Sequence, residues 1–282
     1  MIDRPFGPSG VRVPIVGQGT WNVPARGGAA DAAKAALRAG IERGMVHIDT
    51  AEMYGDGAAE ELVGAAIRGL PRENLFIVSK VLPSHASYAG TIAACERSLR
   101  RLGLDYLDCY LLHWRGTVPL AETMRAFETL TAEGKIRALG VSNFDVDDLA
   151  DALAVLEREP LACNQVLYHL NERTIEDHEL PFAREHGIAT VAYTPFGRGA
   201  YERAPGYATL VDVARRYDAT PAQIVLAFLT RTDAAFAIPK AATIAHAREN
   251  ASAGELRLAA EDLAAIDRAF PAGRRRGGLP SL

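Results

Sequence analysis

Short apolar runs rich in β-branched residues alternate with Ala- and Leu-rich stretches along this 282-residue chain. Each run has the length of one strand and is apolar at consecutive positions, as strands buried on both faces of a parallel sheet are. The eight runs are Pro14–Gly19, Met45–Ile48, Leu75–Ser79, Tyr106–Leu112, Ile136–Val141, Ala162–Val166, Ile188–Ala192 and Ala235–Ile238. The stretches between them have the length of helices, so the pattern predicts a strand–helix unit that repeats along the chain.

Helix signals fall between these runs. Asp31 and Asp145 each open a stretch with helical periodicity, and Thr220–Gln223 combines an N-cap threonine, a proline at the first helical position and a capping-box glutamine. Two helical segments, near Tyr207–Tyr217 and Pro221–Thr230, separate the last two runs. Helix ends are expected at the glycines that follow a helical stretch and precede a run, namely Gly44, Gly103, Gly134 and Gly187.

Eight such units favour a closed barrel over an open sheet. We expect an α/β fold, a (β/α)8 TIM barrel, as a single domain over residues 1–282 with a short C-terminal tail at residues 271–282. The rival fold is a doubly wound dinucleotide-binding sheet, which needs a third glycine after its first strand. Gly17–Asn22 has Asn22 at that position, and no acidic residue follows where this fold requires one.

The composition argues against nucleic-acid-binding, disulfide-rich and membrane proteins. Apolar residues make up 49% of the chain and charged residues 23%, and the net charge is -4, so no general attraction to nucleic acid or to anionic lipid is expected. The cysteines are odd in number and lie in apolar stretches, which favours reduced thiols over a disulfide framework. The first residues resemble no leader, and no apolar stretch is long enough to cross a bilayer. We therefore expect a cytoplasmic protein with no membrane partner.

Polar side chains follow the strand-like runs. In a TIM barrel the chemistry is located where the strands end, so these side chains are expected to share one rim. The residues at the eight strand ends are Thr20, Asp49, Lys80, His113, Ser142, Gln165, Tyr193 and Lys240.

Four residues near this rim form a set that can handle protons. Asp49, Lys80 and His113 end three consecutive strands, and Tyr54 lies in the loop five residues after Asp49. A lysine ammonium beside a phenol stabilises the phenolate, which lets a tyrosine donate its proton near neutral pH. Asp49 would keep Lys80 charged, and His113 could donate a hydrogen bond to a carbonyl oxygen. The set could polarise a carbonyl group, but it contains no nucleophile.

Seven motifs along the chain resemble those of the aldo-keto reductases, in that family's order. They are His47–Gly55, Ser79–Val81, Leu111–Trp114, Gly140–Phe144, Asn164–Val166, Tyr193–Gly197 and Ile238–Lys240. The chain is similar to the small prokaryotic aldehyde and keto reductases of this family, such as methylglyoxal and diketogluconate reductases. The resemblance implies a barrel that uses NADPH, with Tyr54 as general acid, Lys80 and Asp49 tuning it, and His113 orienting the carbonyl.

The resemblance also implies a cofactor site. Ser142, Asn143 and Gln165 would hold the nicotinamide carboxamide, and Tyr193 would stack on the ring. Further along, Lys240 would meet the adenosine 2′-phosphate and Asn250 the adenine. The chain departs from the family at Ala241 and His246, where many members carry serine and arginine, so Thr243 or Arg248 would assist Lys240. NADPH is expected, with NADH as the alternative.

The substrate end is expected to be aromatic and open. Trp21 and Trp114 would line it together with Tyr54 and His113. The segment after Phe270 is short, so the long C-terminal loop of many relatives is expected to be absent or reduced. Small aldehydes, α-oxoaldehydes or keto-sugars are the expected substrates of a monomeric enzyme.

Other interpretations of the same residues stay open. A metal-dependent barrel hydrolase would use His47, Asp49 and His113 as ligands, although Lys80 among them would repel a cation, and we expect no metal. A nucleotide-binding barrel that senses redox state and docks on a partner is the second alternative. Single groups also have structural interpretations. The strand-end charges could form a structural ion-pair network, Tyr193 could be a core aromatic, and Asn143 and Gln165 could cap turns. Gly197–Gly199 could be a plain loop rather than a source of backbone amides for a pyrophosphate, and Arg274–Arg276 could be a solvated tail.

Overall fold

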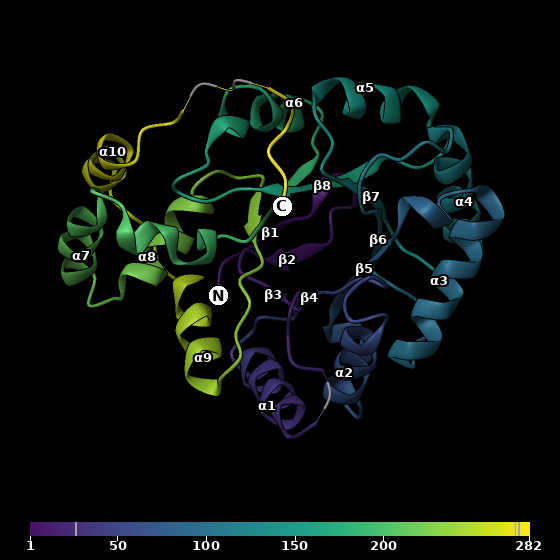
Figure 1. Ribbon diagram of the computed structural model, residues 1–282, viewed down its shortest axis with the longest axis horizontal. Coiled ribbons are helices and arrows are strands. Elements are labelled where there is room, and N and C mark those ends of the chain that lie inside the picture. The colour runs from purple at the N-terminus through teal and green to yellow at the C-terminus, as the bar shows by residue number, and fades with distance from the viewer. Residues whose placement is uncertain (26, 274, 276) are drawn as a thin grey trace.

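Eight parallel strands form one continuous sheet in the order β10-β9-β8-β7-β6-β5-β4-β3, with helices packed around it (Figure 1). The computed structural model describes residues 1–25, 27–273, 275 and 277–282. The strands are β3 (Gln18–Gly19), β4 (His47–Asp49), β5 (Phe76–Val81), β6 (Cys109–Leu112), β7 (Leu139–Ser142), β8 (Leu161–Leu167), β9 (Ala189–Tyr193) and β10 (Ala235–Ala237).

The two ends of this sheet meet. Val16, just before β3, forms a parallel bridge with Ala237 of β10, and the Gly17 amide donates to the Ala237 carbonyl at 2.8 Å. The sheet is therefore a closed barrel, and the predicted (β/α)8 fold is confirmed.

Helices follow the barrel strands in the predicted alternation, and α1 packs against α9 where the ring closes. Two helices, α7 and α8, separate β9 from β10, as the long spacing between the last two runs indicates. The helices are α1 (Gly28–Glu42), α2 (Ala58–Ile67), α3 (Tyr88–Leu102), α4 (Leu120–Ala132), α5 (Val146–Val155), α6 (Glu179–Glu185), α7 (Tyr207–Arg216), α8 (Pro221–Leu229), α9 (Ile244–Ala253) and α10 (Ala260–Ala269).

Most of the predicted helix signals act as expected. The Asp145 side chain accepts from the Asp148 amide, and Thr220 and Gln223 form both bonds of a capping box. Gly103 ends α3 with φ 67°, in the left-handed region where a β-carbon is unfavourable. Asp31 does not open α1, because that helix already begins at Gly28 and Asp31 lies in its first turn.

An N-terminal hairpin closes the end of the barrel where the strands begin. Its strands are β1 (Asp3–Pro5) and β2 (Arg12–Pro14), so the predicted strand Pro14–Gly19 is wrong in extent: Pro14 pairs with Asp3 instead of continuing into the barrel. The buried Phe6 ring lies 4.8 Å from the Phe76 ring between centroids.

The backbone next to Phe6 also packs closely against the barrel. Gly7 has φ +60°, and a β-carbon there would lie 2.2 Å from the Ala162 carbonyl oxygen. The hairpin therefore seals the barrel end opposite the predicted rim.

Cys95, Cys109 and Cys163 are buried free thiols, as expected. Within the described ranges, none of the helices combines the length and apolar character that a bilayer crossing needs.

Candidate active site

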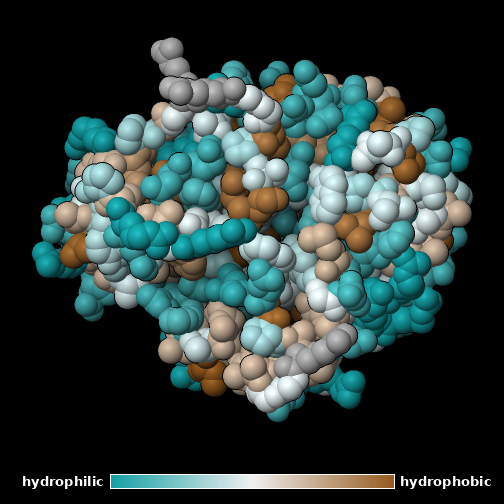
Figure 2. Space-filling model, in the orientation of Figure 1, coloured by the Kyte–Doolittle hydropathy of each residue, from teal (hydrophilic) through white to brown (hydrophobic). Residues whose placement is uncertain are grey.

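The carboxyl ends of the strands surround a cavity of about 800 Å³. Figure 2 shows this face of the molecule hollowed near its centre. The side chains that line the cavity come from every barrel strand or the loop after it except β5. They are Gly19, Trp21, Asn22, Asp49, Met53, Tyr54, His113, Trp114, Ser142, Asn143, Gln165, Tyr193, Thr194, Pro195, Phe196, Arg198, Ile238, Lys240 and Leu282. A cavity of this size at this end of a TIM barrel is the expected place for an active site.

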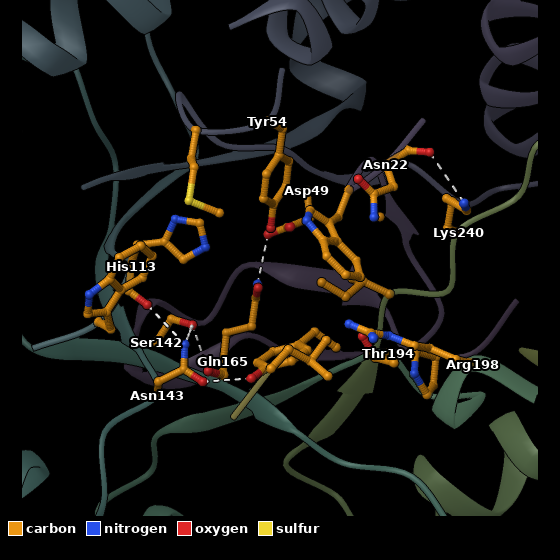
Figure 3. A pocket seen from close by; sticks show the side chains of 18 of the residues that line it. Asn22, Asp49, Tyr54, His113, Ser142, Asn143, Gln165, Thr194, Arg198 and Lys240 are labelled. Atoms are coloured by element: carbon orange, nitrogen blue, oxygen red, sulfur yellow. Dashed lines mark hydrogen bonds between the residues drawn. The ribbon is translucent and has the colours of Figure 1, made fainter. Parts of the chain in front are cut away.

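Lys80 of β5 lies at the floor of the cavity, fully buried. Its ammonium donates to Asp49 Oδ1 at 2.6 Å, to the Thr50 carbonyl at 2.9 Å and to the Tyr54 hydroxyl at 3.2 Å. Asp49 is held from its other side by Gln165 Nε2 at 2.7 Å, a contact drawn in Figure 3. The structure thus brings the three predicted groups within bonding distance.

Burial and charge compete at this cluster. Burial disfavours the Lys80 ammonium, but Asp49 and Tyr54 outweigh it and raise the pKa of Lys80 above its ordinary value. Burial raises the pKa of the Asp49 carboxyl, and the Lys80 ammonium and the Gln165 amide offset part of that effect. Because a buried ammonium and carboxylate at 2.6 Å stabilise each other, Lys80 is a permanent cation at neutral pH.

The pKa of the Tyr54 phenol is shifted in the direction opposite to the one that its lysine neighbour predicts. Burial raises the pKa of its phenol, and the Lys80 ammonium lowers it without overcoming burial. The net direction is therefore opposite to the one expected from the lysine alone. Tyr54 is a neutral phenol in the resting cavity, with Lys80 positioned to stabilise the phenolate as it forms.

His113 lies beside Tyr54, with 5.7 Å between ring centroids and an edge-on arrangement. Burial, with a smaller effect of Lys80, lowers the pKa of His113 to about 3. The ring is therefore neutral at physiological pH. Its Nδ1 atom has no hydrogen-bond partner within the described chain, while its backbone carbonyl accepts from Asn143.

A chain of polar side chains connects β7, β8 and β9. Ser142 Oγ donates to the Gln165 carbonyl at 2.9 Å, and Asn143 Nδ2 donates to Ser142 Oγ at 3.2 Å. The Tyr193 hydroxyl donates to Asn143 Oδ1 at 2.7 Å (Figure 3). Tyr193, Asn143 and Gln165 all face the cavity, and Tyr193 also packs against the hydrophobic core, as its interpretation as a core aromatic implies.

The opposite side of the cavity is basic. The Arg198 guanidinium lies over the Trp21 ring at 5.2 Å, and Lys240 donates to the Asn22 carbonyl at 3.4 Å. Asn22, Asn143, Thr194 and Arg198 all have positive φ and all line the cavity. Strained backbone of this kind is concentrated at functional sites. From the sequence, only the backbone amides of the loop at Arg198 were expected to contribute, and its guanidinium was missed. An arginine between two glycines was the signal that could have indicated it.

The remaining predicted cofactor residues lie on or just before α9 and do not line the cavity. The Thr243 side chain caps the helix by accepting from the His246 amide. His246 and Arg248 are exposed, and Asn250 is buried. Thr243, at the start of α9, is the one of these four residues that lies within a few positions of Lys240 in the sequence.

The C-terminal tail differs from expectation. It returns to the barrel mouth, where Leu282 lines the cavity (Figure 1). Arg275 is not a solvated residue, because its guanidinium binds the buried Glu179 carboxylate. Arg274 and Arg276, the other two residues of that predicted tail, lie outside the described residues.

The three side chains that a metal site would need lie apart from one another. His47 points away from the rim, with its ring 5.7 Å from the Phe6 ring in the sealed end of the barrel. Asp49 is occupied by Lys80. The three proposed ligands therefore do not converge on one point.

Comparison with known proteins decides the family. The model of the aldo/keto reductase family matches residues 15–270. The chain belongs to the aldo/keto reductase family. The resemblance in the seven motifs is thus confirmed, and the protein is an oxidoreductase that acts on carbonyl groups.

Among relatives of this reductase, the methylglyoxal reductase YeaE of Escherichia coli is 45% identical over 95% of each chain. The glyoxal reductase of Bacillus subtilis is 37% identical over 92% of this chain and 90% of its own. A crystal structure of an aldo/keto reductase from Klebsiella pneumoniae in complex with NADP and acetate has 45% identity and a TM-score of 0.92, covering 99% of both chains.

The low pKa of His113 makes the stability of this reductase depend on pH. Below about pH 6.5 the unfolded chain protonates this imidazole and the folded chain does not, so the free energy of unfolding falls as the pH falls. The expected slope from His113 is about 1.4 kcal/mol per pH unit, ending near pH 3 where the folded form is also protonated. His113→Asn should remove its share of the slope in urea unfolding between pH 4 and 6 and leave the share of the buried His47, whose pKa is also lowered to about 3. The exposed His186→Asn is the matched control. An unchanged slope would contradict the neutral state of His113.

Proposed function

We propose that this protein reduces aldehydes or ketones to alcohols with NADPH, using Tyr54 as the general acid. The observation that carries the proposal is the position of the Lys80 ammonium, in contact with both Asp49 and the Tyr54 hydroxyl at the floor of the cavity. The cofactor would supply a hydride to the carbonyl carbon when bound. Side chains of the protein would orient the carbonyl group and supply the proton.

The carbonyl oxygen is proposed to lie between Tyr54 and His113, whose neutral ring would donate a hydrogen bond to it. As negative charge develops on that oxygen, the Tyr54 O–H bond breaks and its proton completes the alcohol. The phenolate left behind is stabilised by Lys80 at 3.2 Å and then takes a proton from water. Asp49 holds Lys80 in place and does not contact the substrate.

The donor set fits a phosphorylated dinucleotide. Arg198 and Lys240 supply cations on one side of the cavity, and Ser142, Asn143 and Gln165 supply amide and hydroxyl groups on the other. We assign the nicotinamide carboxamide to this second group, its ring to the face of Tyr193, and the 2′-phosphate to Lys240. Thr243, Arg248 and His246 at the N-terminal end of α9 would assist Lys240, with Asn250 near the adenine.

The relatives and the lining of the cavity support one class of substrate. The similar proteins named above are methylglyoxal and glyoxal reductases. Trp21, Met53 and Trp114 give the cavity an apolar wall suited to a small aldehyde or α-oxoaldehyde. We propose further that residues 1–282 form one domain that acts as a cytoplasmic monomer without a nucleic-acid partner.

Lys240→Ala tests the cofactor assignment. The variant should bind NADPH about tenfold more weakly, because a charge-assisted contact to the 2′-phosphate contributes about 1.5 kcal/mol. Its affinity for NADH should be unchanged. Fluorescence titration with both nucleotides measures this, and Lys34→Ala on α1 is the matched control. Equal weakening of both nucleotides would contradict the assignment.

Turnover tests the reaction itself. The purified protein should consume NADPH with methylglyoxal, whereas a barrel that only senses or docks would bind NADPH without consuming it. No consumption across a broad panel of aldehydes would overturn the proposed function.

A further inference from the structure

Glu52 is a buried carboxylate that the proposed reaction does not use. It lies in the loop between β4 and α2, two residues before Tyr54, and is only 4% exposed. It does not occur among the described residues that line the cavity. Burying a carboxylate costs free energy unless charged or polar partners compensate for the lost water, so the partners of Glu52 indicate what it does.

Both carboxylate oxygens of Glu52 face the connection between β5 and α3. The Leu82 amide donates to Oε1 at 2.8 Å, and His85 Nδ1 lies 2.9 Å from the same atom. The Arg97 guanidinium of α3 donates to Oε2 at 3.4 Å. Leu82 directly follows β5, the strand of the catalytic lysine, so the Glu52 side chain joins two neighbouring loops at the rim of the barrel.

The backbone gives the middle of the Tyr54 loop no comparable link to β5. Within the described chain, the backbone hydrogen bonds of residues 53–57 stay inside the loop and the first turns of α2. The last backbone contact with β5 runs from the Glu52 amide to the Lys80 carbonyl and is long, at 3.4 Å. The far end of the loop is held by Glu60 of α2, which accepts from Ser79 Oγ at 2.6 Å. Tyr54 thus lies between two carboxylate anchors, of which Glu52 is the nearer in sequence.

We propose that Glu52 is a positioning residue for proton donation. Its carboxylate clamps the Tyr54 loop against the end of β5 and so sets the 3.2 Å contact between the Tyr54 hydroxyl and the Lys80 ammonium. The inference rests on the proposed function, because Glu52 acts only through Tyr54. A misplacement of about 1 Å in a catalytic group can cost about a hundredfold in rate, so a clamp outside the cavity can control turnover without touching the substrate.

Glu52→Ala removes this clamp and should lower kcat for methylglyoxal by about tenfold to a hundredfold. The KM for methylglyoxal and the Kd for NADPH should change little, since Glu52 does not line the cavity. Glu52→Gln keeps an oxygen that can accept from the Leu82 amide, so this conservative variant should restore most of the turnover. Steady-state kinetics and fluorescence titration measure these quantities on the same preparations.

Glu128→Ala is the matched control. Glu128 of α4 is also a buried carboxylate, and its Oε1 accepts from the Glu157 and Arg158 amides at 2.8 and 2.6 Å. None of these three residues lines the cavity. The variant should lose stability in urea unfolding and keep the kcat of the intact protein.

A double-variant comparison distinguishes positioning from folding. In a Tyr54→Phe background there is no hydroxyl to misplace, so adding Glu52→Ala should lower the single-turnover rate of hydride transfer little further. If Glu52→Ala does not fold, His85→Ala takes its place, because the His85 side chain is 43% exposed and its loss removes one contact of the clamp. It should lower kcat severalfold when Tyr54 is present and not in Tyr54→Phe.

Equal losses in the two backgrounds, or a normal kcat in the folded clamp variant, would overturn the proposal and leave the proposed function intact. Near-normal turnover in Tyr54→Phe alone would instead overturn the proposed function, and the inference with it.

Discussion

Replacing Tyr54 with phenylalanine is expected to lower kcat by about 10²–10⁴-fold, the range that a positioned general acid contributes. The substitution removes one oxygen atom, the one 3.2 Å from Lys80 Nζ. The ring, its edge-on packing with His113 and the cationic side of the cavity are all retained. The Kd for NADPH should therefore change little, so that steady-state kinetics and fluorescence titration on the same preparation separate chemistry from binding.

Tyr88→Phe is the matched control, because the Tyr88 hydroxyl lies 3.1 Å from Thr129 Oγ1 between two outer helices. It removes the same atom at a site remote from the cavity and should leave kcat unchanged. Near-normal turnover in Tyr54→Phe would refute the proton-donor role. An equal loss in both variants would show that the effect is not specific to the site.

Replacing Lys80 with methionine is expected to affect both activity and folding. The buried Asp49 carboxylate would lose its counter-ion at 2.6 Å, which costs about 3–5 kcal/mol of unfolding free energy. Turnover should fall at least as far as in Tyr54→Phe, since the phenolate would lose its stabilising cation. Urea unfolding and NADPH consumption measure the two effects independently.

The double variant Asp49→Asn with Lys80→Met distinguishes the two roles of Lys80. Without a buried charge to neutralise, this variant should recover most of the lost stability and none of the lost turnover. Recovery of activity together with stability would mean that Lys80 acts only as a structural partner of Asp49.

The barrel and its rim could be predicted because their signals are local. Asp49, Lys80 and His113 each end a run of apolar residues, and parallel strands bring such ends to one rim even though the register pairs Asp49 with Val78 and Lys80 with Leu111. The position of Tyr54 is different, because it lies in a loop whose path the hydrophobic pattern does not determine. Its placement beside Lys80 was implied by the family motif.

The features that escaped prediction depend on contacts between distant parts of the chain. Phe6 is a single aromatic between prolines and glycines, and nothing near it in the sequence indicates that it packs on Phe76. Arg275 is one of three successive arginines, so its pairing with Glu179 cannot be distinguished from solvation without the fold. The direction of the Tyr54 shift was missed for a related reason, since burial is a property of the assembled cavity.

The bridge between Val16 and Ala237 has a consequence for how the protein is made. During synthesis on the ribosome, the first strand of the barrel must wait for more than two hundred further residues before its second neighbour exists. Until then the growing sheet has an unpaired edge, the kind of surface through which nascent chains associate with one another. Closing the ring is therefore a late and slow event, dominated by contacts of very long sequence separation.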